Sequence, residues 1–388
     1  MSPQETLDLI RKGAAKIISE KELLAKLETG RPLRVKLGVD PTAPDIHLGH
    51  TVPLEKLRQF QVLGHQVVLI IGDFTAMIGD PTGRSVTRPH LTHAEVLENA
   101  KSYTEQAFKI LDRAKTEVVY NGQWFAKMTF DEVIRLNSRV TLQQMLQRED
   151  FRNRIDRAEE VRLHEIQYPI MQGWDSVEVR ADVEIGGTDQ LFNILVGRDM
   201  QKAMDMPQQV VLVVPLLEGL DGVKKMSKSY GNYIGVNDTP GDMFGKAMSI
   251  SDELMARYYT LLLGEDLDPG MHPMEAKKQL AARLVERYHD AAAAVAARSN
   301  WEMMRTDLAA ADLPDFDPTG ETGVIALVAA AYEKCFGGGR SNSDIRRLIQ
   351  QGSIQHNAEK ITDPKAVLTL QSGDVLRLDK KNSVRVVG

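Results

Sequence analysis

Short β-type runs alternate with helical patterns between residues 33 and 216, and this alternation restricts the fold more than any other feature of the sequence. It is typical of a parallel sheet covered by helices, because a parallel strand needs a long, usually helical, connection to the next. We expect strands at residues 33–39, 66–72, 116–120, 181–185 and 209–215, and helices at 51–63, 92–114, 141–148, 159–176 and 188–204. Ligands of such sheets bind outside the carboxyl ends of the strands, so the loops at these ends are candidate binding sites.

Beyond residue 240 the sequence becomes helical and rich in alanine, which predicts a second, α-helical domain. From residue 341 a short helical pattern is followed by apolar runs at 366–370 and 374–378, which together predict a small α+β module. The expected order is an α/β parallel-sheet domain, a glycine-flanked loop, a helical domain and the module, at residues 1–220, 221–235, 236–330 and 331–388.

The composition is that of an ordinary globular protein, with 43% hydrophobic and 26% charged residues among 388. No run reaches the roughly 18 apolar residues of a membrane span, and the first residues lack a signal-peptide pattern, so we expect a cytoplasmic protein without membrane contact. The single cysteine, Cys335, excludes an internal disulfide and paired thiolate ligands for zinc. The net charge of −6 gives no global sign of nucleic-acid binding, but residues 340–388 carry nine Lys or Arg against five Asp or Glu, a local 9 − 5 = +4.

Two histidines, His47 and His50, lie between the first of these strands and its helix, in the stretch Asp40-Pro-Thr-Ala-Pro-Asp-Ile-His-Leu-Gly-His50. Spaced three apart, they share one face of a first helical turn, whose free N–H groups favour anions. Gly49 between them leaves room for a planar ligand against the backbone. A nucleotide phosphate site, a capped structural turn and a metal site are all compatible with this stretch, although no cysteine or acidic ligand set for zinc stands nearby.

Two later loops carry positive charge. The first, at 79–88, combines glycines and prolines with Arg84 and Arg88, which either clamp a polyphosphate or face solvent. It is not a Walker loop, because no Gly-Lys-Ser/Thr follows. The second, Lys224-Lys-Met-Ser-Lys-Ser229, places three lysines between glycines. It is either a solvated loop or one that closes over an anion and neutralises charge during phosphoryl or nucleotidyl transfer.

Polar residues also mark two other expected helices, one along its face and one at its start. Tyr168, Gln172 and Asp175 share one helix face at spacings i, i+4 and i+7, which indicates either a binding face or the solvent face of an amphipathic helix that Pro169 kinks. The stretch Gly186-Gly-Thr-Asp-Gln190 follows a strand, so its glycines allow close approach of a ligand and its aspartate is suited to ribose hydroxyls.

These five segments, in this order, resemble the class I aminoacyl-tRNA synthetases, and within them the bacterial tyrosyl-tRNA synthetases. His47-Leu-Gly-His50 looks like the HIGH signature of the class, and Lys225-Met-Ser-Lys-Ser229 matches its KMSKS signature. The helix face with Tyr168, Gln172 and Asp175 separates tyrosine from tryptophan enzymes. The resemblance covers nearly the whole chain and implies a Rossmann-like catalytic domain, a helical anticodon-binding domain and a C-terminal RNA-binding domain of the S-four-like kind.

The resemblance also implies which residues handle the nucleotide. The expected catalytic residues, which contact the γ-phosphate, the ribose or the departing pyrophosphate, are Thr42, His47, His50, Arg84, Arg88, Lys225 and Lys228. The expected ATP-binding residues are Asp40, Gly49, His50, Gly187, Asp189, Lys225, Met226, Ser227, Lys228 and Ser229. ATP is a substrate that carries Mg²⁺ with it, and no protein-bound structural metal is expected.

On the amino-acid side, the residues expected to bind tyrosine are Lys36, Asp40, Asp80, Tyr168, Gln172, Asp175 and Gln190. Asp175 would accept the hydrogen bond of the phenolic hydroxyl. Lys36 departs from the family pattern, which often has a tyrosine at this position as a second partner of that hydroxyl. A lysine is able to donate to the phenolic oxygen or to pair with Asp175. Arg84 likewise stands where many members have lysine, which keeps the charge but changes the hydrogen-bond geometry.

The implied reaction joins tyrosine to ATP as tyrosyl-adenylate, releases pyrophosphate and then acylates the terminal adenosine of tRNA. The implied partners are tRNA, tyrosine, ATP and a second copy of the chain, with neither DNA nor a membrane. Three other readings compete with this one: a tryptophan-specific enzyme of the same class, a small-molecule nucleotidyltransferase, and a non-catalytic RNA-binding protein on a synthetase scaffold.

Overall fold

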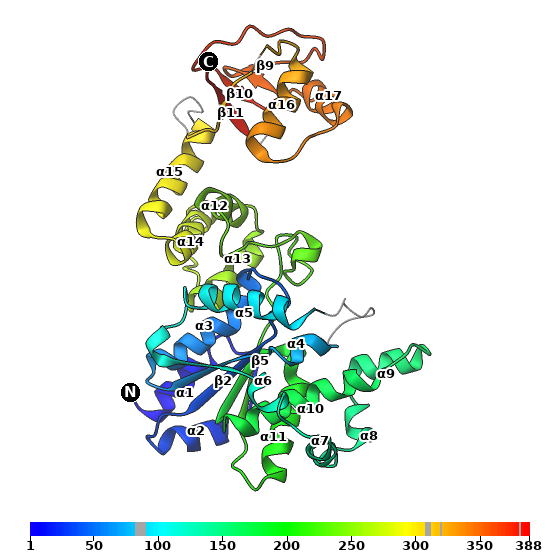
Figure 1. The fold of residues 1–388 in the computed structure, drawn as a ribbon. Helices are drawn as coiled ribbons and strands as arrows, with labels where there is room; N and C mark the ends of the chain where they lie inside the picture. Colours follow the sequence, from blue (N-terminus) through cyan, green and yellow to red (C-terminus); the bar gives the residue numbers. More distant parts are fainter. Residues whose placement is uncertain (82–90, 307–311, 319, 380–381) are drawn as a thin grey trace. The chain divides into compact units, whose positions relative to one another are not determined.

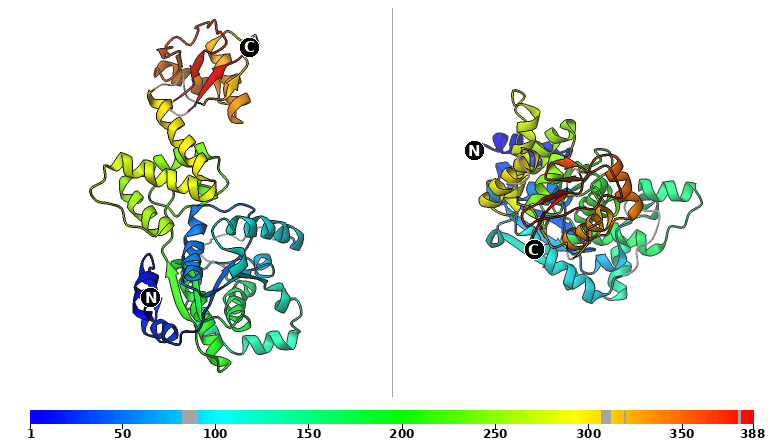
Figure 2. Two further views of the ribbon diagram at one scale, coloured as in Figure 1. Left: turned by 90° about the vertical axis from the view of Figure 1, so that its left-hand side faces the viewer. Right: turned by 90° about the horizontal axis from the view of Figure 1, so that it is seen from above.

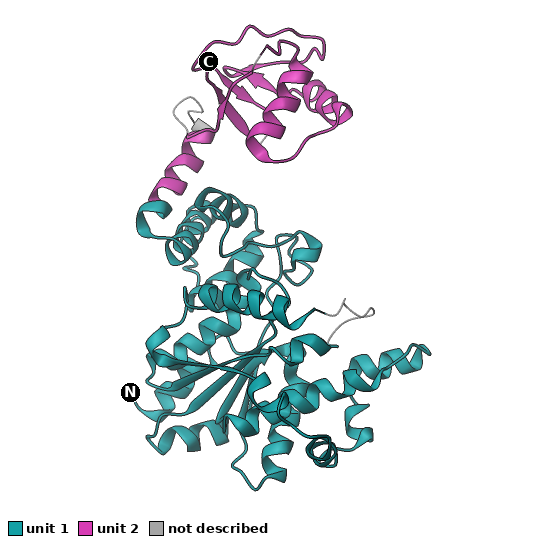
Figure 3. Cartoon of the chain, viewed as in Figure 1, with its two compact units in different colours: residues 1–294 teal, residues 295–388 magenta. Residues whose placement is uncertain are grey.

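The computed structural model describes residues 1–81, 91–306, 312–318, 320–379 and 382–388. These residues form two compact units, Met1–Ala294 and Val295–Gly388, which Figure 3 colours separately. Each unit has buried hydrophobic clusters of its own. Among the helices that the structure describes, none combines the length and the apolar character of a membrane span.

A six-stranded sheet in the order β1-β6-β5-β2-β3-β4 lies at the centre of the first unit (Figure 1). Its strands are β1 (Lys16–Ile18), β2 (Arg34–Val39), β3 (Gln66–Ile71), β4 (Thr116–Tyr120), β5 (Val183–Gly187) and β6 (Val210–Val214). Strands β2 to β6 pair in parallel, whereas β1 pairs antiparallel with β6. The five predicted strands are confirmed to within two residues at each end. The three-residue edge strand β1 is an addition that the sequence pattern does not predict.

Helices cover both faces of this sheet, which explains why β3 and β6 are continuous apolar runs with almost no exposed surface. The helices up to residue 203 are α1 (Pro3–Arg11), α2 (Glu20–Glu28), α3 (Leu48–Val62), α4 (Thr75–Ile78), α5 (His93–Ala107), α6 (Gly122–Phe125), α7 (Phe130–Asn137), α8 (Leu142–Met145), α9 (Glu149–Asp156), α10 (Leu163–Glu178) and α11 (Leu191–Ala203). Short 3₁₀ turns are η1 (Arg113–Lys115), η2 (Thr188–Gln190) and η3 (Lys228–Tyr230).

The strand order creates a topological switch point between β2 and β5. From β2 the chain proceeds outward through α3 to β3 and through α5 to β4, whereas from β5 it proceeds in the opposite direction through α11 to β6. Because such crossovers are right-handed, the helices of the two halves lie on opposite faces of the sheet, as Figures 1 and 2 show. The carboxyl ends of β2 and β5 therefore open into the position where sheets of this kind bind ligands.

Residues 240–294 form a helical segment that belongs to the first unit. It contains α12 (Pro240–Met248), α13 (Asp252–Tyr258), the π-helix η4 (Tyr259–Leu263), α14 (Pro273–Tyr288) and the start of α15 (Ala291–Thr306). α14 and α15 are separate helices, because the backbone leaves the helical conformation at His289. Leu280, Leu284 and Tyr288, which are four residues apart and so share one face of α14, are all buried.

The described residues of the second unit form most of α15, a small five-stranded sheet and the helices α16 (Val324–Phe336) and α17 (Asn342–Gln350). Its sheet has the order β7-β11-β10-β8-β9, with β7 (Asp315–Phe316), β8 (Gln355–His356), β9 (Glu359–Lys360), β10 (Val375–Arg377) and β11 (Ser383–Val386). Helices α16 and α17 pack their apolar faces against this sheet, around buried residues such as Leu327, Ile345, Ile349 and Leu376.

Two expectations for this region need correction. The apolar run 366–370 is not a strand: its backbone pairs with the segment before α16, and Val367 is 70% exposed. The expected boundary at 330/331 falls inside α16, whose buried side chains share one core with α17 and β10. All of α16 therefore lies in the second unit, which begins at Val295.

Candidate active site

Segments from four strand ends meet at the switch point. Asp40 follows β2 directly, Gly72 follows β3, Asn121 follows β4 and Gly187 is the last residue of β5. The approach is close: a Cβ on Gly72 would lie 2.1 Å from Oδ1 of Asp40 and 2.3 Å from Oγ1 of Thr75. Glycine at this position therefore lets the loops after β2 and β3 touch, which brings their polar side chains into one site.

The histidine pair forms the start of α3. His47 is the N-cap residue: its Nδ1 accepts the N–H of Gly49 at 3.2 Å, and Nδ1 of His50 accepts the N–H of His47 at 3.3 Å. The two rings stack with centroids 3.8 Å apart. Because both Nδ1 atoms accept, the proton of each neutral ring is on Nε2, where it is available to a ligand. The predicted shared face is confirmed, and the capped turn is present as well.

His47 is a neutral donor near pH 7. Burial, followed by the neighbouring His50 and Lys228, lowers the pKa of His47 to about 3. Gly49 protects this arrangement, because a Cβ there would lie 3.0 Å from two atoms of the His47 ring. The turn thus offers N–H groups to an anion without adding a positive charge of its own.

The second signature is held beside the first by backbone pairing. Leu48 N–H donates to the carbonyl of Ile234 at 2.9 Å and Val236 N–H to that of Ile46 at 3.1 Å, so the segment after the lysine loop lies along the start of α3. Lys228 Nζ lies 3.0 Å from a carboxylate oxygen of Asp45. Lys225 Nζ lies 3.8 Å from one of Asp189. The structure therefore brings both predicted lysines to the two strand ends that flank the switch point.

Met226 anchors the loop between these lysines. Its side chain is 4% exposed, and its N–H donates to the carbonyl of Leu217 at 2.8 Å. The Ser227 and Ser229 hydroxyls are 2.8 Å apart. Arg84 and Arg88 lie outside the described residues, so their predicted part in the site stays a prediction.

Most of the predicted tyrosine-binding residues belong to one of two hydrogen-bonded clusters, one around Asp40 and one around Asp80. Tyr168 OH donates to Asp40 Oδ2 at 2.9 Å, and Gln190 Nε2 donates to Asp80 Oδ2 at 2.7 Å. Asn193 Nδ2 bridges the side-chain oxygens of Gln172 and Gln190, at 2.9 and 3.1 Å. Burial and the nearby Asp40 raise the pKa of Tyr168 well above its usual value, so its hydroxyl stays a donor.

Asp175 is a buried acid that hydrogen bonds through Asn121 and Thr75 join to Asp40. The residue is 4% exposed, Trp124 Nε1 donates to its Oδ1 at 3.0 Å, and Asn121 Nδ2 donates to its Oδ2 at 3.3 Å. Burial raises the pKa of Asp175 to about 7, although the charge of Lys36 and the two hydrogen bonds act in the opposite direction. A further hydrogen-bond donor that reaches a carboxylate in this environment stabilises its ionised form strongly.

Lys36 does not pair with Asp175, which corrects one of the two expectations for this residue. Its Nζ lies 3.0 Å from Glu184 Oε1 on β5 and also donates to Ser176 Oγ and to the carbonyl of Gln172. β2 and β5 are paired strands, and Lys36 stands directly beside Glu184 in their register. The neighbouring strand thus supplies the counter-ion.

Four residues of the site were not predicted from the sequence: Thr75, Asn121, Trp124 and Asn193. Asn121 and Trp124 follow the carboxyl end of β4, so the strand-end rule could have pointed to them. Asn193 lies three residues after Gln190, on the same side of the chain's next helical turn. Thr75 gives no comparable signal, because only the close approach at Gly72 brings its hydroxyl within 2.8 Å of Asp40.

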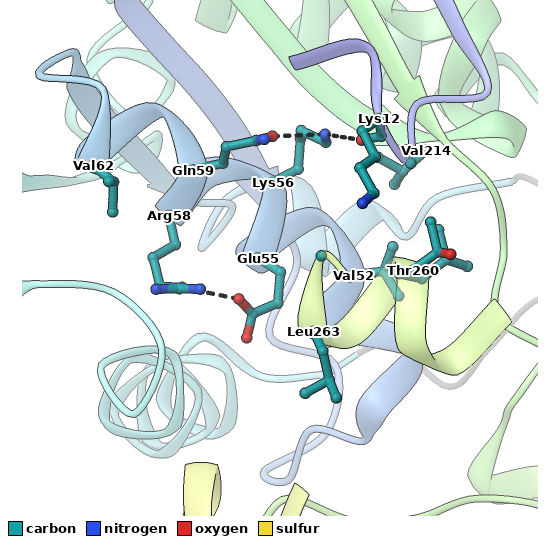
Figure 4. A pocket seen from close by; sticks show the side chains of 13 residues that line it. Lys12, Val52, Glu55, Lys56, Arg58, Gln59, Val62, Val214, Thr260 and Leu263 are labelled. Carbon is teal, nitrogen blue, oxygen red and sulfur yellow. Dashed lines mark hydrogen bonds and ion pairs between the residues drawn. The ribbon is translucent and has the colours of Figure 1, made fainter. Parts of the chain in front are cut away.

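The described residues outside this site hold a cavity and no candidate metal centre. They contain no group of three or more His, Cys, Asp or Glu that could hold a metal ion. A cavity of about 270 Å³ lies beside α3, lined among others by Lys12, Val52, Glu55, Lys56 and Leu263 (Figure 4). Lys56 there donates to the carbonyls of Ile10 and Lys12 and to Gln59, so it ties the end of α1 to α3. None of the predicted site residues lines this cavity.

Comparison with known proteins places the chain in a family. The family described as tRNA synthetases class I (W and Y) matches residues 28–311, and the chain belongs to it. Its curated relatives include the tyrosine-tRNA ligase of Colwellia psychrerythraea, 48% identical over 388 residues, with 97% of each chain covered. The tyrosine-tRNA ligase of Aquifex aeolicus is 48% identical over 393 residues, with both chains covered completely. Within the class, the chain is therefore a member of the tyrosine-tRNA ligases.

Solved structures agree with this fold. The tyrosyl-tRNA synthetase of Archaeoglobus fulgidus, in complex with L-tyrosine, has a TM-score of 0.61 and 24% identity, and the match covers 76% of this chain and 99% of that one. A C-terminally truncated mitochondrial tyrosyl-tRNA synthetase of Coccidioides posadasii has a TM-score of 0.62, also at 24% identity, with 77% and 94% covered. At this identity the structures support the fold alone.

Proposed function

We propose that this chain is a tyrosine-tRNA ligase that activates tyrosine with ATP to tyrosyl-adenylate and then transfers the tyrosyl group to its tRNA. The observation that carries the proposal is the buried carboxylate of Asp175. Each of its oxygens accepts one hydrogen bond from the protein, from Trp124 or Asn121, and each has a second acceptor position. The phenolic hydroxyl of tyrosine is a donor that fits this position, whereas phenylalanine has none to offer.

The α-ammonium of the substrate fits the acidic groups of the two clusters. Asp40 and Asp80 carry the negative charge, and Tyr168, Gln172 and Gln190 hold polar groups around it. The distance from Asp40 to Asp175 is bridged by hydrogen bonds through Thr75 and Asn121, so both ends of the substrate are read by one connected set. Such preorganisation places the tyrosine carboxylate for attack without a protein nucleophile.

The ATP side fits the residues around the start of α3. His47 and His50 offer neutral N–H donors, Gly187 and Asp189 lie at the end of β5, and Lys225 and Lys228 bring positive charge to the same place. As pyrophosphate departs, negative charge grows on its oxygens, and fixed cations and N–H dipoles stabilise it. Mg²⁺ enters with ATP. Phosphate oxygens supply its ligands, in agreement with the oxygen preference of this ion.

Pyrophosphate exchange tests the proposal directly. Tyrosine should support exchange of labelled pyrophosphate into ATP, whereas tryptophan and phenylalanine should not, because neither supplies a hydroxyl to Asp175. In the Asp175→Asn variant, kcat/KM for tyrosine should fall by about tenfold or more, since a hydrogen bond to a charged acceptor is lost. The KM for ATP should stay close to that of the unmodified protein.

The matched control is Glu178→Gln, the same carboxyl-to-amide change three residues later on an exposed part of α10. It should exchange like the parent. Exchange that depends on tryptophan would favour the other specificity of the class, and exchange with none of the twenty amino acids would end the enzyme proposal.

The second unit is proposed to bind tRNA. Its exposed cations include Arg346 and Arg347 on α17, Lys360 on β9 and Lys365. RNA phosphates attract such a surface without base contacts. tRNA charging is part of protein synthesis, so a cytoplasmic site of action follows from this proposal.

Charge reversal tests the role of the second unit in the full-length chain. The double variant Arg346→Glu/Lys360→Glu should charge tRNA with a higher KM for tRNA. The salt dependence of charging should be shallower, because the variant contacts fewer phosphates and its binding releases fewer counter-ions. Tyrosine-dependent pyrophosphate exchange should not change. The control Lys16→Glu/Lys21→Glu makes the same change in charge at exposed residues of the first unit. Equal tRNA charging by both double variants and the parent would contradict the proposed role.

The active chain is further proposed to be a homodimer. Five large apolar side chains between α7 and the start of α10 are 47–80% exposed, namely Phe130, Ile134, Leu142, Ile155 and Leu163. Exposed apolar side chains concentrated in one segment are typical of a surface that another chain covers. Sedimentation velocity at micromolar concentration should show a dimer, and Phe130→Glu/Leu163→Glu should shift it toward the monomer. A monomeric parent protein would refute this.

A further inference from the structure

Lys36 is fully buried beside the turn of α10 that carries Gln172 and Asp175. Its side chain is 0% exposed and that of its partner Glu184 is 2% exposed. The ammonium group donates to three acceptors: Gln172 O at 3.0 Å, Ser176 Oγ at 2.8 Å and Glu184 Oε1 at 3.0 Å. An ammonium group has three N–H donors, so all of them are used within the protein. Lys36 therefore has no donor left for a substrate hydroxyl.

Glu184 is equally well satisfied. Its Oε1 also accepts from Gln172 Nε2 at 3.2 Å, and its Oε2 accepts from Ser176 Oγ at 2.8 Å and from Gln209 Nε2 at 2.5 Å. Gly197 on α11 leaves the space for this cluster, since a Cβ there would lie 2.6 Å from Gln209 Nε2. Four elements, β2, β5, α10 and the residue before β6, thus meet at one buried ion pair.

The Lys36–Glu184 ion pair fixes one turn of α10 by hydrogen bonds. Its contacts are to Gln172 and Ser176, and between these two lies Asp175. Two residues assigned to substrate binding, Gln172 and Asp175, are therefore fixed by groups that do not themselves reach the substrate. A chain with a shorter or uncharged residue at position 36 would lose both the contact to this turn and the positive charge beneath Asp175.

We propose that Lys36 and Glu184 are positioning residues for the substrate tyrosine: they fix the α10 turn between Gln172 and Asp175, and Lys36 supplies the charge that keeps the Asp175 carboxylate ready to accept the substrate hydroxyl. This inference rests on the proposed tyrosine-tRNA ligase function. It assigns Lys36 a role through Asp175 in place of direct contact with the substrate.

The electrostatics give each member of the pair its own signature. The groups that face Asp175 are Lys36 on β2, Glu184 on β5, and the neutral donors Asn121 and Trp124 after β4. On its own helix the affected group is Tyr168, whose pKa is raised by burial and also by the charge of Asp175. The charge of Lys36 lowers the pKa of Asp175, and the charge of Glu184 raises it. Removing one charge or the other should therefore move the ionisation of Asp175 in opposite directions. A purely structural role predicts no such opposition.

The test measures kcat/KM for tyrosine against pH by pyrophosphate exchange, in the full-length chain. An ionised Asp175 is needed to accept the hydroxyl, so activity falls on the acid side. Lys36→Met should move this acid limb to higher pH, and Glu184→Gln should move it to lower pH. A displacement of one pH unit corresponds to about a tenfold change below the limb. The double variant Lys36→Met/Glu184→Gln should lie between the two single variants.

Two further variants keep the test decisive. The double variant leaves no unpaired buried charge, so it should fold even where a single variant does not. Ser176→Ala removes one contact to Lys36 and leaves both charges, so its acid limb should coincide with that of the parent. The KM for ATP should change by less than about twofold in all of them, because the ATP side lies elsewhere.

Coincident acid limbs in the parent, Glu184→Gln and the double variant would overturn the proposal. Loss of tyrosine-over-phenylalanine selection in Lys36→Met with no displacement of its acid limb would also overturn it, because that result indicates direct contact of Lys36 with the hydroxyl. A parent protein without tyrosine-dependent exchange would instead refute the proposed function itself, so the two failures are distinguishable.

Discussion

A carboxylate that is enclosed by protein and must still be able to ionise is the constraint on which the amino-acid site depends. Asp175 loses most of its hydration, and burial alone would favour its protonated form. The structure offsets this with two fixed donors, Asn121 and Trp124, and with the buried ammonium of Lys36 below. With a pKa of about 7, the protonated and ionised forms of Asp175 are similarly populated near neutral pH. One additional donor, the hydroxyl of tyrosine, therefore shifts the carboxyl strongly toward the ionised form.

The parallel sheet makes this arrangement available. Lys36 and Glu184 are neighbours because β2 and β5 pair in register, and β2 and β5 are neighbours because the strand order reverses between them. The same reversal sends the loops after β2 and β5 to one place, where Asp40 and Gly187 begin the two halves of the site. On the nucleotide side, backbone pairing of Leu48 with Ile234 holds the histidine and lysine signatures together.

The end of α14 contacts both the start of α3, which carries the two histidines, and the segment that follows the lysine loop. Tyr288 OH donates to Thr51 Oγ1 at 3.1 Å, next to His50, and His289 Nε2 lies 2.9 Å from the carbonyl of Asp238, shortly after the lysine loop. Arg287 lies 2.8 Å from Glu55 on α3. These contacts explain why residues 240–294 belong to the same compact unit as the sheet, although their composition suggests a separate domain.

How far the sequence predicts this protein depends on the range of the interactions concerned. The strands of the parallel sheet are apolar runs with local turn signals, and the histidine turn is defined by its own i, i+3 spacing, so both are predictable. Strand β1 depends on pairing with β6, some 200 residues later, and the run at 366–370 lies beside α16 in place of forming a strand. The partner of Lys36 is likewise set by strand register, which periodicity does not reveal.

Calorimetry of tyrosine binding is the most direct test of the central claim, that the substrate hydroxyl binds to an ionised Asp175 whose pKa in the free protein is about 7. Titrations in buffers of different ionisation enthalpy count the protons exchanged on binding. At pH 6 the free carboxyl is mostly protonated, so tyrosine should release about one proton, and this number should fall toward zero above about pH 8. Binding of tyrosine at pH 6 without proton release would contradict the account.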